Sequence, residues 1–354
     1  MQNHLKLRRS YLDVLRILAS FLVCFNHSDG FHIYLDQQPD GSIVSWLMVV
    51  ISVITRVNIP LFMMITGALT LGKAESYRGM GKRISRFAVI LLGASLVKYS
   101  VEHAGNFSLG NFARAVFSGS VNMSYWYLYA YMAYLMAQPF LCRIAEKLTG
   151  KDAAFLVMLR FVLVSVYPLL NYGLQCLSLE PIRLSGDLQL PLSVLNIFFY
   201  PLIGYYLANV LPVEQLEKKK LWLWVPVFVA GVSIASLVTY HEGVHAAFTQ
   251  NYLGLFDYAA AMAVFVAARG LLEEAYFPEK LRKLLASWSG FTLGIYVMEP
   301  LLALFFYIPF FDYAYRFHPV IRLGFSAVWC LFIIAAGSLL TYLLRRIPGC
   351  KKLL

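Results

Sequence analysis

One apolar stretch near the N-terminus carries the residues best suited to chemistry. Residues 11–27 read YLDVLRILASFLVCFNH, and Asp13, Arg16, Ser20 and His27 interrupt an otherwise hydrophobic run. Their spacing of i, i+3, i+7 and i+14 places all four along one stripe of a helix. A charge near the centre of a membrane costs about 3 kcal/mol or more. We therefore expect the stripe to face a protein interior or a water-filled cavity.

His27 is the candidate general base of this stripe, because an imidazole at the outer end of a span can meet water and accept a proton. The alternative is a histidine that only marks the helix end at the membrane interface. Arg16 could orient a substrate, bind an anion or pair with Asp13, three residues earlier. A purely structural pair between Asp13 and Arg16 stays open, since charges inside membranes usually pair.

The second apolar stretch, residues 46–71, is interrupted near its middle by Arg56, Asn58 and Pro60. Proline removes a backbone donor, and such a break is tolerated where the backbone is buried in protein or lines a cavity. Arg56 is therefore a substrate-binding candidate. Gly67 further along would permit close approach of another helix, so packing explains it at least as well as function.

A basic pair, Arg83 and Arg86, ends the segment 72–86, which we expect to be a cytoplasmic loop. At i and i+3 the two side chains share a helix face and could hold phosphate oxygens in their fork-shaped groups. The alternative is anchoring at the membrane surface through lipid phosphates.

The fourth span begins SYWYLYAYMAYLMAQPFL and is crowded with aromatic residues, most of which an aromatic belt at the membrane interface would explain. Trp126 and Tyr127 are the substrate-binding candidates among them. Later spans contribute Asp257, Glu299 and Arg322, which could join His27 and Arg56 in a pocket between helices. Whether they converge depends on how the spans pack.

Membrane-spanning helices must position these residues. The chain has 354 residues, 60% hydrophobic and 14% charged, with a mean hydropathy of +0.65, whereas soluble proteins carry about 25% charge. We predict an all-α polytopic membrane protein with about ten transmembrane helices in one integral membrane domain, residues 1–354. The candidate spans are 11–27, 46–71, 86–101, 125–141, 153–175, 192–211, 221–240, 252–269, 288–310 and 320–344.

Positive charge predicts the orientation. With the N-terminus in the cytoplasm, the cytoplasmic segments hold 22 Lys and Arg, and the opposite loops hold three: Arg114, Arg183 and Arg316. This asymmetry predicts cytoplasmic N- and C-termini. It also explains the net charge of +11 without nucleic-acid binding.

The cysteines and histidines suggest no metal and no disulfide framework. The five cysteines show no paired spacing, and the seven histidines show one weak pair, His241 and His245, at i and i+4.

The chain resembles the membrane-bound acyltransferase family 3 from about residue 10 to 345. Members carry an Arg, ten intervening residues and a His in the first span, here Arg16 and His27. The family's cytoplasmic Arg-x-x-Arg pair corresponds to Arg83 and Arg86. IPLFMMITGALTL, WYLYAYMAYLMAQPFL and SGFTLGIYVMEP are similar to its second-span, Trp-Tyr-Leu and late Gly-Ile-Tyr motifs, in the same order.

The resemblance implies an enzyme of the plasma or inner membrane that moves an acyl group, usually acetyl, from acyl-CoA to a hydroxyl of a cell-surface glycan or lipid-linked sugar. Acetyl-CoA would be the donor substrate, with no bound cofactor, and membrane lipids would surround the protein. His27 would be the base, Arg16 would position the donor or support the oxyanion, and Arg83 and Arg86 would hold the CoA phosphates.

Asp13 and Glu299 are the remaining catalytic candidates. The family's late motif commonly ends in His-Pro, whereas this chain has Glu299-Pro300. If that histidine does chemistry in relatives, Glu299 could replace it as a base or a hydrogen-bond acceptor.

Two other classes of protein fit the same residues. A transporter or flippase for a sugar or lipid would also use buried charges and a broken helix. In a sensor or scaffold, the polar stripe would only specify helix packing, so changing Arg16 or His27 would alter stability and not turnover.

Overall fold

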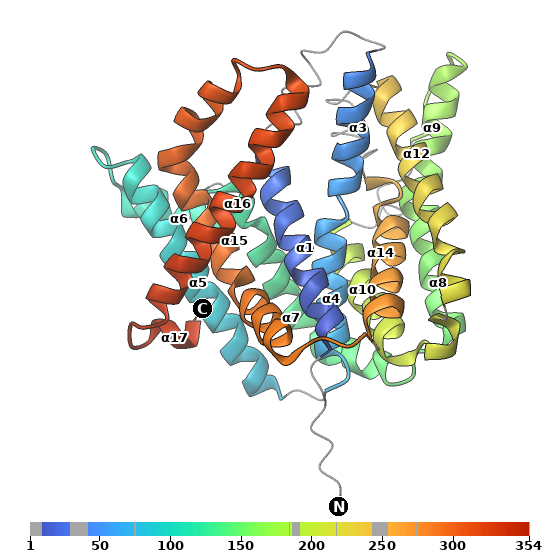
Figure 1. Cartoon of the computed structure of the whole chain (residues 1–354), viewed down its shortest axis with the longest axis horizontal. Helices are drawn as coiled ribbons and strands as arrows, with labels where there is room; N and C mark the ends of the chain where they lie inside the picture. The colour runs from blue at the N-terminus through green and yellow to red at the C-terminus, as the bar shows by residue number, and fades with distance from the viewer. Residues whose placement is uncertain are drawn as a thin grey trace, which may run out of the picture.

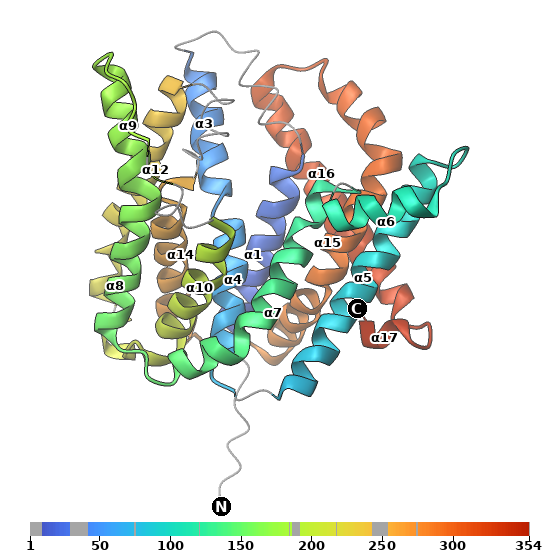
Figure 2. The ribbon, with the colours of Figure 1, turned by 180° about the vertical axis from the view of Figure 1, so that it is seen from behind.

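The computed structural model describes residues 9–28, 42–73, 76–119, 121–183, 185, 192–216, 218–242, 254–273 and 275–353. Within these ranges the chain forms helices and no strand. The long helices stand side by side in one bundle (Figure 1), and the view from behind shows the same arrangement (Figure 2).

The α-helices are α1 (Ser10–Asn26), α3 (Ile43–Thr55), α4 (Asn58–Thr70), α5 (Tyr77–Glu102), α6 (Leu109–Ser118), α7 (Trp126–Ala145), α8 (Gly150–Arg160), α9 (Tyr167–Cys176), α10 (Leu192–Tyr205), α11 (Lys218–Leu221), α12 (Trp224–Glu242), α14 (Asp257–Leu272), α15 (Glu279–Ala314), α16 (Pro319–Leu344) and α17 (Cys350–Leu353). The other helical turns are η1 (Met123–Tyr125) and η5 (Val213–Leu216), which are 3-10, and η2 (Phe161–Val166) and η4 (Tyr206–Val210), which are π-helical.

Six of the described helical stretches are long and apolar enough to cross a membrane. They are Ile43–Thr70, Tyr77–Glu102, Gly150–Cys176, Trp224–Glu242, Glu279–Ala314 and Pro319–Leu344. The other expected spans also fall on helices, but α1 and α14 have only 17 and 16 residues. The all-helical membrane fold is therefore supported, while the total of ten spans stays a prediction.

Several boundaries expected from hydropathy are wrong. Helix α5 begins at Tyr77, so most of the expected loop 72–86 is helix, and α15 begins at Glu279, nine residues before the expected span. Helix α6 was not expected at all. Hydropathy detects only the apolar part of a helix, whereas the Ser76 hydroxyl caps α5 by accepting from the Gly79 N–H, a polar contact before that part begins.

The expected break in the second span is confirmed. Helix α3 ends at Thr55 and α4 begins at Asn58, leaving Arg56 and Val57 between them. The Asn58 side-chain oxygen accepts from the Ile59 N–H at 2.6 Å. Pro60 falls in the first turn of α4, where its missing N–H has no helical partner to lose.

The core of the bundle forms around α1, α4, α10 and α14. Helices α4 and α10 cross so closely that Gly67 lies against the Pro201 backbone and Gly204 lies against the Met64 backbone. This contact bears out the packing interpretation of Gly67. Small residues at a crossing let two backbones meet inside a membrane protein.

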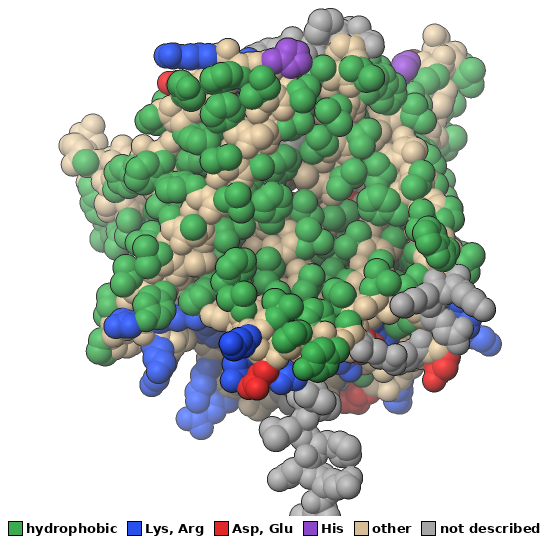
Figure 3. Space-filling view, in the orientation of Figure 1, with side chains coloured by type: hydrophobic (Ala, Val, Ile, Leu, Met, Phe, Trp, Pro, Cys, Tyr) green, Lys and Arg blue, Asp and Glu red, His purple; other side chains and the backbone are tan. Residues whose placement is uncertain are grey.

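The surface separates by residue type. Figure 3 shows hydrophobic side chains over the middle of the bundle, while Lys and Arg gather along its lower edge. The helix ends at that edge include the start of α1 and the ends of α4, α14 and α16 (Figure 1). An apolar belt with charge at one end is the pattern of an integral membrane protein.

The α4–α10 crossing generates a stability prediction. We expect Gly67→Ala or Gly204→Ala to cost about 1–3 kcal/mol, because the new methyl group would overlap the facing backbone. Gly93→Ala on α5 is the matched control, since no atom lies within 4 Å of its Cβ position. Thermal melting of the purified protein in nanodiscs measures the effect, and equal melting of all three variants would contradict the proposed packing.

Candidate functional site

The site is built between two parallel helices, α1 and α15, joined by a polar contact at each end. At the lower end Arg16 Nη1 donates to Ser289 Oγ at 3.0 Å. At the upper end His27 Nδ1 lies 3.1 Å from Glu299 Oε2. The intervals of eleven residues on α1 and ten on α15 correspond to about 16 and 15 Å along a helix, so the two contacts keep register.

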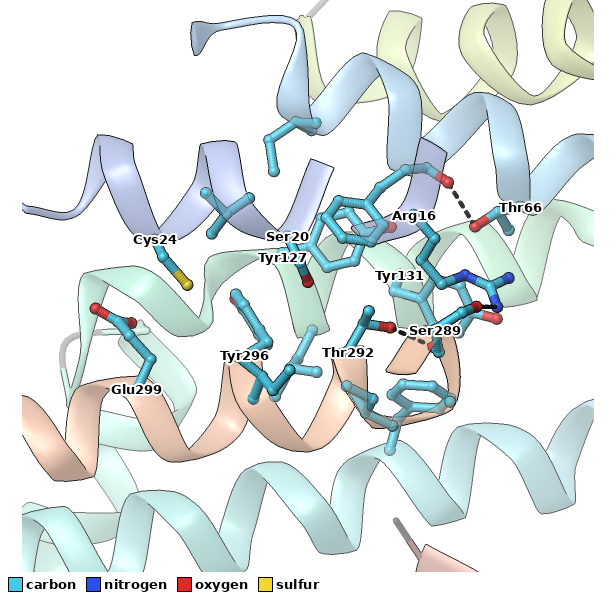
Figure 4. Close-up of a pocket in the computed structure, with 18 of the residues that line it drawn as sticks. Arg16, Ser20, Cys24, Thr66, Tyr127, Tyr131, Ser289, Thr292, Tyr296 and Glu299 are labelled. Carbon is cyan, nitrogen blue, oxygen red and sulfur yellow. Dashed lines mark hydrogen bonds between the residues drawn. The ribbon is translucent and has the colours of Figure 1, made fainter. Parts of the chain in front are cut away.

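A long cavity of about 370 Å³ runs between these two contacts. Figure 4 shows Arg16 and Ser289 at one end of it and Cys24 and Glu299 at the other. Helices α1, α4, α5, α7 and α15 all contribute to its walls. The polar lining residues are Arg16, Ser20, Thr66, Arg86, Tyr127, Tyr131, Ser289, Thr292, Tyr296 and Glu299.

A second cavity, the polar cavity of about 270 Å³, lies beside the break between α3 and α4. Its lining includes His27, Arg56, Asn58, Trp126, Asn196, Tyr200 and Asp257. The helix break therefore does what its sequence predicted, because the interrupted backbone lines a cavity. A cation, an anion, amides and an exposed indole are the groups that recognise a polar ring.

A third space, the side pocket of about 460 Å³, lies between α5 and α15. Its lining contains Lys98, Ala303 and Ile308, together with His27 and Glu299. Ile308 is 68% exposed, so this pocket reaches the surface that faces lipid.

The three spaces meet at the His27–Glu299 pair. His27 lines the polar cavity and the side pocket, and Glu299 lines the long cavity and the side pocket. Tyr127 and Tyr296 line both the long and the polar cavities. The Glu299 side chain is 6% exposed and that of His27 is 23% exposed. A buried carboxylate thus orients a partly open imidazole where the spaces join.

A buried network forms the wall of the polar cavity opposite His27. Arg160, 1% exposed, donates to Asn196 Oδ1 at 2.9 Å, to the Tyr200 hydroxyl at 2.6 Å and to Asp257 Oδ1 at 3.4 Å. The Tyr200 hydroxyl also donates to Asp257 Oδ1 at 3.0 Å. The rings of Phe199, Tyr200 and Tyr258 lie 4.5–5.4 Å from the guanidinium carbon. The network fixes the Asp257 carboxylate at the cavity wall.

The structure gathers most of the expected site residues. His27, Arg56, Trp126, Tyr127 and Asp257 line the polar cavity.

The other expected residues have different positions. Asp13 is buried, 4% exposed, but lines none of the three spaces, because it lies one turn nearer the start of α1 than Arg16. Arg83 interacts with Tyr131, a wall residue of the long cavity. Arg322 instead donates to the Phe317 and Tyr315 carbonyl oxygens, so it stabilises the turn before α16.

The expected aromatic belt is wrong for most of the fourth span. Tyr125 and Tyr134 are almost fully buried, while Tyr127 and Tyr131 line the long cavity. These rings lie inside the bundle because the packing of α7 against α5 and α10 turns them inward. Trp126, at 47% exposed, fits the interface position better.

The weak histidine pair leads to no metal site. His241 lies 3.8 Å from a carboxylate oxygen of Glu242, and His245 lies outside the described residues. No cluster of three or more metal-ligating side chains occurs in the described part of the chain.

Sequence analysis missed the stripe that faces α1. Ser289, Thr292, Tyr296 and Glu299 follow i, i+3, i+7 and i+10 spacing and all line the long cavity. The same periodicity that identified the first span could have found them. Arg160 was counted only as a charge within a span, yet a buried arginine in a membrane helix is itself a signal.

These features define an integral membrane protein with a polar reaction chamber enclosed by its helices. The chain belongs to acyltransferase family 3, because the family model of this acyltransferase domain matches residues 9–344, nearly the whole chain. Comparison with curated proteins gives no match. Comparison with solved structures gives none either.

The buried network yields a second stability prediction. We expect Arg160→Met to cost about 3–5 kcal/mol, because the Asp257 carboxylate would lose its buried cationic partner. Tyr200→Phe removes one hydroxyl and should cost about 1–3 kcal/mol. Arg143→Met, at an exposed position near the end of α7, is the control and should melt like the wild type. If Arg160→Met melted like Arg143→Met, the network would not support the wall.

Proposed function

We propose that this protein is a membrane O-acyltransferase, probably — by family resemblance — an O-acetyltransferase, that takes the acyl group from cytoplasmic acyl-CoA. The acceptor would be a hydroxyl of a cell-surface glycan or lipid-linked sugar. One observation carries the proposal: the long cavity connects a basic end at Arg86 with the His27–Glu299 pair, where the polar cavity begins. Two substrates could therefore meet at one base from different sides.

The donor would enter at the basic end. The gathering of Lys and Arg along the lower edge supports a cytoplasmic location for that edge, where acyl-CoA is made (Figure 3). Arg83 and Arg86 would hold the CoA phosphates, and the thioester arm would extend through the long cavity toward His27. Arg16 lies about three turns from His27 and contacts Ser289, so we assign it to the arm of the donor and not to the reacting carbonyl.

The acceptor would occupy the polar cavity. Arg56, Asn196 and Asp257 offer hydrogen-bonding groups of both kinds, and Trp126 offers a face on which a sugar ring can stack. The combination suits a polyhydroxylated ring.

His27 would be the general base. With its Nδ1–H donating to Glu299, the imidazole presents Nε2 to the acceptor hydroxyl. Nε2 takes the hydroxyl proton, the oxygen attacks the thioester carbonyl carbon, and the carbon–sulfur bond breaks. The departing CoA thiolate then receives the proton from His27. The products are the ester and free CoA.

Glu299 would be a positioning residue in this step. Its buried carboxylate holds the imidazole ring in one orientation and stabilises the imidazolium that forms during the transfer. This role explains why a carboxylate can stand where the family motif commonly has histidine.

The first functional prediction concerns the base. We expect His27→Ala to lower acyl transfer by about 10²–10⁴-fold, because the acceptor hydroxyl loses its proton acceptor. Base-labile ester acetate on surface glycans, compared at matched protein levels, measures the loss. His103→Ala, which changes a histidine at the end of α5 outside the three spaces, is the control. Full transfer by a folded His27→Ala protein would refute the assignment.

The second functional prediction concerns orientation. We expect Glu299→Gln to keep the shape of the pocket and lower kcat on the order of 100-fold, with little change in KM for the donor. Glu242→Gln is the matched control, because Glu242 also lies beside a histidine but far from the cavities. A change in KM with kcat unchanged would show that Glu299 binds substrate and does not position the base.

A further inference from the structure

A third arginine reaches the lower end of the long cavity. Arg345 directly follows α16, and its Nη2 donates to the Gly290 carbonyl oxygen at 2.6 Å. Its guanidinium also lies over the Phe291 ring, 4.9 Å from the centroid. Because Gly290 lines the long cavity, Arg345 comes from a distant part of the sequence to the same end of the cavity as Arg86.

The C-terminal helix α17 brings further positive charge to this end. Arg86 Nε donates to the Leu353 carbonyl oxygen at 2.8 Å. Both views show α17 beside the lower part of α5, in agreement with the contacts between the two helices (Figures 1 and 2). Lys351 and Lys352 on α17 are exposed.

This gathering of like charge has a cost. Partial burial and the nearby Arg86 guanidinium lower the pKa of Arg345 from its ordinary value, which means that the two cations disfavour one another. The dipole of α16 favours positive charge after its last turn, and that accounts for both Arg345 and Arg346. It does not account for the difference between them, because Arg346 stays on its own helix, over the Tyr342 ring, while Arg345 reaches across to α15.

We propose that Arg345 and Arg86 form a phosphate-binding site at the lower end of the long cavity, occupied by the diphosphate of the acyl donor. Two fork-shaped guanidinium groups from two helices can each bind a phosphate pair, and a polyanion between them removes their mutual repulsion. The proposal rests on the proposed function and adds to it a ligand that lies outside the Arg-x-x-Arg pair. Lys351 and Lys352 provide the positive rim that attracts the anion.

Binding of CoA tests the site without requiring transfer. CoA is titrated into the full-length protein in nanodiscs of zwitterionic lipid. Arg345→Gln should weaken binding about tenfold or more, since it removes a charged hydrogen-bonding group. Arg346→Gln, with the same charge change one residue later, should stay within about twofold of the wild type. Arg345→Lys should fall between them, because it keeps the charge and loses the fork.

Unchanged binding in Arg345→Gln, or an equal loss in Arg346→Gln, would overturn the proposal, because only general surface charge would then matter. The titration is repeated with phosphatidylglycerol in the nanodisc, since a lipid headgroup carries the same phosphate chemistry. If this lipid stabilises the wild type through Arg345 while CoA has no effect, the occupant is a headgroup and the donor assignment is wrong. Failure of the proposed function looks different: CoA would bind through Arg345, yet no acyl group would be transferred.

Discussion

The register between α1 and α15 is the constraint on which the rest of the site depends. Two polar contacts, Arg16 with Ser289 and His27 with Glu299, join parallel helices at two levels. Polar groups that pair inside a membrane avoid the cost of facing lipid. A shift of one helix by a single turn would break both contacts together. The polar stripes therefore fix the register and at the same time line the cavity between them.

The cavities exist because other parts of the bundle pack very closely. Glycines at the α4–α10 crossing let two backbones meet, and the Arg160 network ties α8 to α10 and α14. With these helices held together, the break between α3 and α4 can line the polar cavity without losing the fold. The opening at the site is offset by dense contact elsewhere.

The two ends of the long cavity differ in chemistry. One end is basic, through Arg86 and the neighbouring Arg345, and the other holds a base beside a carboxylate. A polyanionic donor suits the first end, and proton transfer suits the second. The separation of about 15 Å between them matches a reaction in which a long carrier is bound at one place and reacts at another.

The sequence alone determined the class of protein, the positions of the apolar helices and the break at Arg56 to Pro60, because hydropathy, periodicity and proline act locally. It also indicated His27 and Arg16, since charge in an apolar run is visible without a fold. It could not exclude Asp13 and Arg322, include Asp257 and Arg160, or turn the α7 tyrosines inward. Those outcomes depend on which helices pack together and at what height, and only the tertiary structure decides the relative placement of residues hundreds of positions apart, such as His27 and Glu299.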